Sequence, residues 1–280
     1  MTNRAMINAA VTMGQLQKGL DVTADNISNV NTYGYKSRGT SFNSLLFQEQ
    51  NNLPSEDNTD EDRLTPDGLR LGTGAQLSAT PMDTKQGGLQ ETGRTLDFAL
   101  TQPNTFFKVQ VADEGGAPSV QYTRNGTFYL QPDNDSDQMN LVTSEGHAVL
   151  DADNQPIQVN QNFKSLNVDG TGNMEVEYPQ GTAQLGQLGL TDVTRPQLLV
   201  GQGNGRYTFD GLAARGLNLA DVSNQYNSGE SVVRQGSLEQ SNVDLTEAMT
   251  DLTTMQRSYQ FNARSIRVHD QMMGLVNSIR

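Results

Sequence analysis

The chain has 280 residues, a formal net charge of −13 and a hydrophobic content of 34%, enough apolar side chains to build a core for part of its length. It contains no cysteine and two histidines, which excludes disulfides, thiolate metal ligands and histidine-rich metal sites. Its most apolar runs are far shorter than the ~20 residues that a membrane-spanning helix needs, so we expect no membrane insertion. Residues 1–6 lack a continuous apolar stretch and a small-residue cleavage site, so we expect no cleavable secretory signal.

The charge is unevenly distributed along the chain. Residues 1–48 carry a net charge of +2 and residues 236–280 carry −1, whereas residues 49–235 carry −14. Nearly neutral ends can pack against copies of themselves, and a strongly acidic middle stays solvated. Nucleic acids and anionic membranes are unfavourable partners for such a surface because like charges repel. We therefore expect no nucleic-acid partner.

The first thirty residues predict an α-helix with one apolar seam. Apolar or small side chains recur at alternating spacings of three and four residues, which is the heptad pattern of a coiled coil. The seam residues are Met6, Ala9, Met13, Leu16, Leu20, Thr23 and Ile27. The pattern stops at the turn-forming segment 29–34, in which Gly34 is a helix stop signal. We expect a coiled-coil helix over residues 1–31.

The last forty residues repeat this pattern over more than four heptads. Asn242 and Asp244 are candidate N-caps, and no proline interrupts the seam that follows. The seam residues are Leu245, Ala248, Leu252, Met255, Tyr259, Asn262, Ile266, His269, Met273 and Val276. The two polar members, Asn262 and His269, would cost stability but fix register and partner number. The sequence therefore predicts a second coiled-coil helix over residues 241–280.

Between the two helices the chain predicts a central antiparallel β domain over residues 96–235. Short alternating or β-branched runs are separated by clusters of Gly, Asn, Asp and Pro, as in a twisted sheet or partial barrel. The expected strands are 106–111, 120–122, 127–130, 141–143, 148–150, 157–159, 166–168, 174–178, 185–191, 198–200, 207–209 and 231–234. Residues 32–95 predict an extended connector, with the polar, acidic stretch 49–74 as a long exposed loop. The fold class is thus mainly β with long terminal α-helices.

Two segments contain residue types found in ligand-binding loops. Asp133 to Asp137 places carboxylates at alternate positions as a calcium loop does, but Gln138 and Ser144 stand where that loop needs Gly and Glu. Gly201 to Gly205 is as rich in glycine as a phosphate-binding loop, but a strand pattern follows it instead of a helix. We expect a hairpin loop at the first segment and a tight turn at the second.

Ser144, His147 and Asp151 could in principle supply a nucleophile, a base and an orienting carboxylate. They are crowded around one turn, and no nucleophile elbow surrounds the serine. We therefore expect no catalytic residues, no bound metal and no cofactor.

Several motifs resemble those of the flagellar basal-body rod and hook family. Residues 24–36 resemble the family's amino-terminal signature Asn-Asn-Ile-Ala-Asn-x-Asn-Thr-x-Gly-(Tyr/Phe)-Lys, with Asp25 where Asn is usual and Ser28 where Ala is usual. Residues 241–245 and 255–262 resemble the carboxy-terminal signature. Further rod-protein patterns follow in the same order at 96–100, 106–109, 122–128 and 141–146. The likeness covers most of the chain.

The resemblance implies a structural axial subunit of the basal-body rod and not an enzyme. Proteins of this family leave the cell unfolded through the flagellar export apparatus and add to a helical tube, with the terminal helices in an inner layer and the β domain outside. The implied partners are further copies of this chain, other rod and hook proteins and the export apparatus, and the implied location is the flagellar basal body. The chain length argues against the hook protein itself and favours distal-rod-like subunits, particularly those of Bacillus-type bacteria.

On this interpretation, the assembly interface consists of the two helical seams and the turn between the layers. Asn26 and Asn29 suit turns or caps because their side chains bond nearby backbone, and Gly34 would allow a positive φ.

Two other functions are compatible with parts of the pattern. A secreted oligomeric binding or adhesin-like module with coiled-coil ends would form closed oligomers, whereas a rod subunit forms open helical arrays. A hydrolase of cell-wall glycan would need a pair of carboxylates in a suitable context, and the middle region offers no convincing pair.

Overall fold

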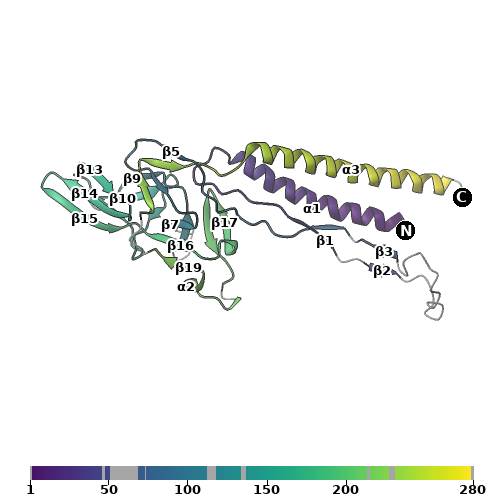
Figure 1. The fold of residues 1–280 in the computed structure, drawn as a ribbon, viewed down its shortest axis with the longest axis horizontal. Coiled ribbons are helices and arrows are strands. Elements are labelled where there is room, and N and C mark those ends of the chain that lie inside the picture. The colour runs from purple at the N-terminus through teal and green to yellow at the C-terminus, as the bar shows by residue number, and fades with distance from the viewer. Residues whose placement is uncertain are drawn as a thin grey trace. The chain divides into compact units, whose positions relative to one another are not determined.

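The computed structural model describes residues 2–45, 48–50, 69–72, 74–111, 118–133, 137–212, 215–226 and 231–278 (Figure 1). The chain divides into two compact units. The first consists of Met1–Ile27, Arg38–Pro81 and Leu245–Arg280, and the second of Ser28–Ser37 and Met82–Asp244. Each unit therefore contains segments that are far apart in sequence.

Two long helices dominate the first unit. Helix α1 spans Thr2–Ser28 and helix α3 spans Leu245–Ser278; they run in opposite directions, with the two chain termini at the same end of the pair (Figure 1). The helices touch where Thr23 Oγ1 lies 4.0 Å from Met255 Sδ. The terminal helices predicted from the sequence are thus confirmed, and α1 ends where the Asn- and Gly-containing turn begins.

Two short strand pairs complete the first unit. Strand β1 (Phe42–Ser44) pairs with β4 (Ala75–Leu77), and β2 (Gln48–Gln50) pairs with β3 (Leu69–Leu71), both antiparallel. The expectation of a loop over residues 49–74 is therefore wrong at the ends of that stretch; residues 51–68 and 73 lie outside the described residues. Three-residue strands are too short for alternation to identify them, and each becomes a strand only through a partner some twenty or more residues away.

Polar side chains of α1 bind the backbone of the returning strand β4 and the residues before it. Asn8 Nδ2 donates to Gly72 O at 2.7 Å, and Gln15 Oε1 accepts from Leu77 N at 3.2 Å. Between them, Thr12 Oγ1 accepts a longer hydrogen bond, of 3.4 Å, from the backbone amide of the first residue of β4. Side chains at these spacings share one helix face, so one face of α1 contacts the extended connector.

The second unit is built on antiparallel strands. Ten of the described strands form one sheet, with the path β12-β10-β11-β7-β8-β18-β17, β9 on β10, β16 on β7 and β19 on β16. Their bounds are β7 Thr105–Val111, β8 Ser119–Thr123, β9 Phe128–Pro132, β10 Gln138–Thr143, β11 Ala148–Val149, β12 Gln158–Asn160, β16 Leu190–Val193, β17 Leu199–Gly203, β18 Arg206–Phe209 and β19 Ser223–Gln225. The central antiparallel β region predicted from the sequence is confirmed.

Smaller sheets and two short helices make up the rest of the second unit. Strands β13 (Ser165–Val168), β14 (Asn173–Tyr178) and β15 (Gly181–Gln187) form a three-stranded sheet. Strand β5 (Leu89–Glu91) pairs with β21 (Ser237–Glu239), and β6 (Phe98–Leu100) pairs with β20 (Val233–Gln235). The short helices are η1 (Pro196–Leu198) and α2 (Leu219–Val222).

The run 185–191, expected as one strand, is divided between β15 and β16. Gly189 lies at the division, where its amide donates to Leu150 O at 2.9 Å. A Cβ at this position would lie 2.6 Å from the carbonyl oxygens of Leu150 and Asp151. The expectation of one strand was wrong because this close backbone approach, which sequence alternation does not report, places a glycine and a new register inside the run.

The central strand β7 is buried on both faces. Phe106 and Phe107 both have 0% exposure but belong to different apolar clusters, since successive strand residues point to opposite faces. Phe107 packs edge-on against Phe128, with ring centroids 5.2 Å apart, and Phe106 packs edge-on against Tyr207 at 5.9 Å. Burial of each such ring contributes about 1.5–3 kcal/mol, so these two clusters hold the second unit together.

Candidate assembly site

The predicted seam of α3 is the least exposed face of that helix. Ala248 and Met255 are buried, and five further seam residues are half-buried: Leu252, Tyr259, Asn262, Ile266 and His269. The remaining three, Leu245, Met273 and Val276, are 44%, 48% and 68% exposed. Within one chain, then, the seam is covered over its middle part, and its carboxy-terminal end is left open to solvent.

The buried stripe of α1 only partly follows the predicted seam. Ala9, Leu16 and Thr23 are buried as expected, while Met6, Met13, Leu20 and Ile27 are half-buried. Gly19 and Asn26 are buried as well. A Cβ at Gly19 would lie 2.8 Å from Phe42 Cζ and 3.2 Å from Met255 Sδ. A small residue thus lets neighbouring elements approach α1 closely, a feature that a search for large apolar residues overlooks.

Asn26 and Asn29 both bond to backbone or turn residues, but over different ranges. Asn26 Nδ2 donates to Arg38 O at 2.8 Å, and Arg38 N donates to Asn26 Oδ1 at 3.0 Å. This two-way contact imitates a strand pairing and joins residues twelve positions apart. Asn29 acts locally, because its Oδ1 accepts from Thr32 Oγ1 at 3.2 Å and its carbonyl accepts from the amide of the same threonine.

Gly34 has the positive φ, +69°, that its place in the turn suggested. It is constrained a second time by packing, because a Cβ there would lie 2.5–2.6 Å from backbone atoms of Arg124 and Asn125. Its amide donates to Glu239 O at 2.8 Å. Glycine is therefore required for both conformation and space at this position.

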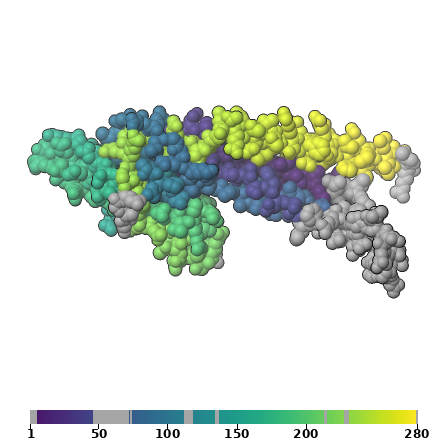
Figure 2. Space-filling model, in the orientation of Figure 1, coloured from purple at the N-terminus to yellow at the C-terminus, as the bar shows by residue number. Residues whose placement is uncertain are grey.

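A second apolar stripe on α3 was not anticipated from the sequence. Phe261, Val268, Met272 and Leu275 recur at heptad-like spacings and are 71%, 53%, 43% and 64% exposed. At 100° per residue this stripe lies roughly a third of a turn around the helix from the first seam. Figure 2 shows α3 at the surface along its length, beside α1. One polar residue, Ser265, falls at a position of this stripe between Phe261 and Val268, and this interrupts the apolar pattern in the sequence.

The chain was compared with known proteins by family and by individual relative. The family model for the flagella basal body rod protein matches residues 6–36, that for the flagellar hook protein FlgE/F/G D1 domain matches 102–176, and that for the flagellar basal body rod FlgEFG protein C-terminal region matches 234–279. The chain is 40% identical over 99% of both sequences to the flagellar hook-basal body complex protein FlhP of Bacillus subtilis. It is 31% identical to the flagellar basal-body rod protein FlgG of Borreliella burgdorferi, over 99% of this chain and 98% of the relative.

This chain belongs to the flagellar basal-body rod protein family. It is a structural protein of the bacterial flagellum, located in the basal body. Two of the three matched regions of this rod-family protein coincide with the helical ends, because 6–36 covers most of α1 with its following turn and 234–279 covers α3. The surfaces described above therefore lie on the parts of the chain that carry the family resemblance.

Two of the three residues that could have formed a catalytic triad, His147 and Asp151, have other partners. His147 Nε2 lies 3.1 Å from Glu145 Oε2. Asp151 Oδ1 accepts from the amides of Asp153 and Gln155 at 2.9 and 2.8 Å. The carboxylate that would have oriented the imidazole thus holds its own turn.

The two loop segments also differ in outcome. Gly203, Asn204 and Gly205 have positive φ and join β17 to β18, which confirms the expected tight turn. Residues 134–136 of the acidic segment lie outside the described residues.

Among the residues that the structure describes, no group of three or more His, Cys, Asp or Glu side chains could hold a metal ion. The described helices include none long and apolar enough to cross a membrane.

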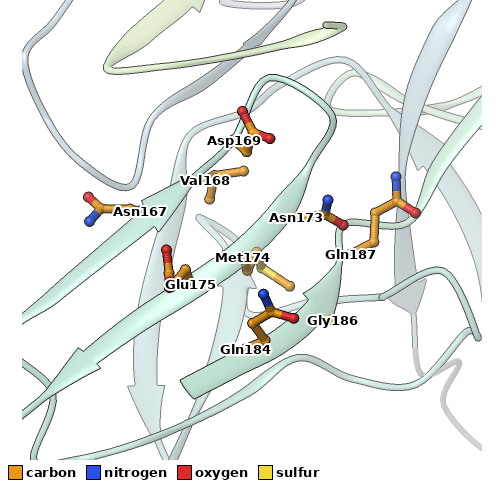
Figure 3. A pocket seen from close by; sticks show the side chains of 9 residues that line it. All are labelled: Asn167, Val168, Asp169, Asn173, Met174, Glu175, Gln184, Gly186 and Gln187. Atoms are coloured by element: carbon orange, nitrogen blue, oxygen red, sulfur yellow. The ribbon is translucent and has the colours of Figure 1, made fainter. Parts of the chain in front are cut away.

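A cavity of about 440 Å³ lies at the three-stranded sheet (Figure 3). Its lining is Asn167, Val168, Asp169, Asn173, Met174, Glu175, Gln184, Gly186 and Gln187. Asp169 Oδ1 already accepts from Gly170 N at 2.6 Å, and Gln187 Nε2 donates to Thr171 O at 2.8 Å. The lining offers amides and the carboxylates of Asp169 and Glu175, but no histidine, cysteine, serine or lysine.

Proposed function

We propose that the chain polymerises through its two terminal helices into a helical tube that forms part of the rod and connects to the hook. The helices at residues 1–31 and 241–280 form coiled-coil contacts with further copies and with other rod and hook proteins, while the β region of residues 96–235 takes no part in these helical contacts. The family resemblance further supports passage through the flagellar export apparatus before assembly.

The observation that carries this proposal is the second apolar stripe of α3. Its largest member, Phe261, is 71% exposed, and Leu275 is 64% exposed. Contiguous exposed apolar side chains on a soluble protein mark interaction surfaces, and a helix with two apolar stripes can contact two neighbours at once. One stripe of α3 faces α1 of the same chain near Met255, so the other remains for a neighbouring subunit.

The interface residues proposed from the sequence have distinct roles in this arrangement. Leu16, Leu252 and Met255 are covered within one chain and hold the helical pair together. Met273 and Val276 are exposed and join the surface available to neighbours. The near-neutral charge of both ends favours such contacts, since it lowers repulsion between copies.

We also propose that the chain has no enzymatic activity and needs no cofactor. The separate contacts of His147 and Asp151 support this, as does a cavity lining without histidine, cysteine, serine or lysine on the three-stranded sheet.

Replacing Phe261 with Asp tests the assembly surface without disturbing the fold. The side chain is exposed, so we expect the thermal midpoint of the monomer to stay within a few degrees of wild type. A buried unpaired carboxylate in the interface should reduce assembly severely, and the variant should fail to restore motility or hook formation in a strain lacking the gene. Basal bodies isolated from that strain provide the direct measurement.

Thr253→Asp is the matched control, because Thr253 is an exposed residue of α3 outside both stripes. It should assemble normally. If both variants assemble equally well, the second stripe is not an interface. Closed oligomers of the purified protein, in place of open arrays, would favour the binding-module alternative.

A further inference from the structure

Three buried charged side chains meet in the second unit, although they come from distant parts of the sequence. Lys36, Arg124 and Glu239 are 1%, 1% and 2% exposed. Lys36 Nζ lies 2.8 Å from Glu239 Oε1, and Arg124 Nε lies 2.7 Å from Glu239 Oε2. One carboxylate is therefore shared by two cations, and all three side chains are buried.

Each of these side chains also binds backbone from another segment. Lys36 Nζ donates to Lys85 O at 2.6 Å, and Glu239 Oε1 accepts from Gly87 N at 2.9 Å. Arg124 Nη1 donates to the carbonyl oxygens of residues 102, 103 and 105. The cluster thus connects five stretches of chain, around residues 36, 85–87, 102–105, 124 and 239.

A neighbouring amide extends this network. Asn242 Oδ1 accepts from Ser37 N at 2.7 Å, while its Nδ2 donates to Asp83 O at 2.8 Å and Lys85 O at 3.1 Å. Ser37 O in turn accepts from Asp83 N at 2.8 Å. Residues 37, 83 and 242 are close to the points where the chain leaves or enters this unit. Asn242, a candidate helix cap on sequence grounds, is engaged here instead.

We propose that Lys36, Arg124 and Glu239 form a charged latch that fixes, within the second unit, three of the four segments by which the chain enters and leaves it. These segments are residues 34–37, 83–87 and 239–242. The proposal concerns the fold of a single subunit and stands whether or not the subunit polymerises as proposed above.

The charges of the cluster explain why it can hold the chain segments in one arrangement. Burying two cations with one shared carboxylate is costly unless the charged groups keep their partners, and Arg124 Nη2 is already buried without a hydrogen-bond partner among the described residues. Burial, with a contribution from Arg124, lowers the pKa of Lys36 from 10.5 to about 8. A charged Lys36 is therefore held in the fold against a desolvation cost, and its two short bonds to Glu239 and Lys85 select one arrangement of the segments.

Hydrogen exchange of the full-length monomer tests the latch at individual amides. Glu239→Gln keeps the shape of the side chain but leaves two buried cations without a counter-charge. We expect the amides of Gly34, Ser37 and Gly87 to exchange at least tenfold faster, while amides of β7 such as that of Val109 keep their protection. Glu91→Gln, which removes a carboxylate from the exposed pair with Arg234, is the control and should change none of these rates.

A second variant keeps the test decisive if the Glu239 variant does not fold. Lys36→Met leaves Arg124 and Glu239 as a balanced pair, so the second unit should fold. It should speed exchange at Ser37 and Asp83 at least threefold, and leave Gly87 unchanged. Exchange at Ser37 and Asp83 equal to wild type in this variant would overturn the latch. So would a Glu239→Gln protein in which β7 loses protection as much as the three segments do, since the cluster would then stabilise the whole unit uniformly.

Discussion

Two separate demands, one on backbone conformation and one on space, require a glycine at Gly34. Its φ of +69° disfavours any side chain, and the backbone of Arg124 occupies the space where a Cβ would lie. The first demand could be inferred from the sequence, because glycine after an Asn-rich segment is typical of a left-handed turn. The second could not, since it depends on a residue ninety positions away.

Replacing Gly34 with Ala should therefore cost more than conformation alone. The left-handed conformation costs an alanine about 1–2 kcal/mol, and the overlap with backbone should add about 1–3 kcal/mol more. Gly93→Ala is the matched control, because Gly93 has a φ of +70° and open space around its Cβ position. Urea unfolding of both variants measures the difference. Equal losses of unfolding free energy would mean that the contact with Arg124 relaxes without cost.

The lowered pKa of Lys36 predicts that the unfolding free energy rises with pH. Its pKa is about 8 in the folded chain and 10.5 in the unfolded chain, so between these values the unfolded chain binds more protons. Stability contributed through Lys36 is therefore fully present above pH 10.5 and is lost as the pH falls through 8. The unfolding free energy of wild type, relative to Lys36→Met, should rise by about 2 kcal/mol from pH 7.5 to 9.5. A relative value that is flat or falls would show that Lys36 is not held charged against desolvation.

Among the elements, length decides what sequence patterns reveal. Helix α3 has 34 residues, so its alternating spacing of three and four residues repeats often enough to identify both the helix and the face that packs inward. Strands such as β6 and β21 have three residues each and are buried only because a distant partner completes them. β21 was missed, although Glu239 within it holds the cluster with Lys36 and Arg124. A buried glutamate in a short polar run carries no local signal of burial, because its partners are supplied by tertiary structure.

Some features of the assembly site could likewise be predicted from the sequence, and others could not. The first seam of α3 was predicted because its members are mostly large and apolar. The second stripe was not, since Ser265 separates Phe261 from its other apolar members and no single turn of the helix displays it. Gly19 was missed for the opposite reason: it contributes by the absence of a side chain, which brings Phe42 and Met255 close to α1. Small residues at helix contacts become visible only once the partner is placed.

At the scale of the whole molecule, the two units differ in how they are stabilised. The second unit has an extensive buried core over its sheets, whereas every described residue of α3 from Asp270 onward is exposed. An isolated helix gains little stability from propensity alone, so α3 depends on packing against partners. This contrast could be expected from the sequence but its boundary could not, because β21 extends the second unit beyond the residues expected to end the β domain.

Limited proteolysis of dilute monomer should therefore remove α3 before it cuts the second unit. The exposed carboxy-terminal part, which includes Phe261 and Leu275, should be trimmed first because it has few contacts to oppose local opening. Trimming should then stop after Asn242, since β21 and the amide of that residue are bonded within the second unit. Mass spectrometry of the digest locates the stop. A stop near Gly236 would show that β21 and the latch open as readily as the helix, and full-length protein as resistant as the fragment would show that α3 is stable without neighbours.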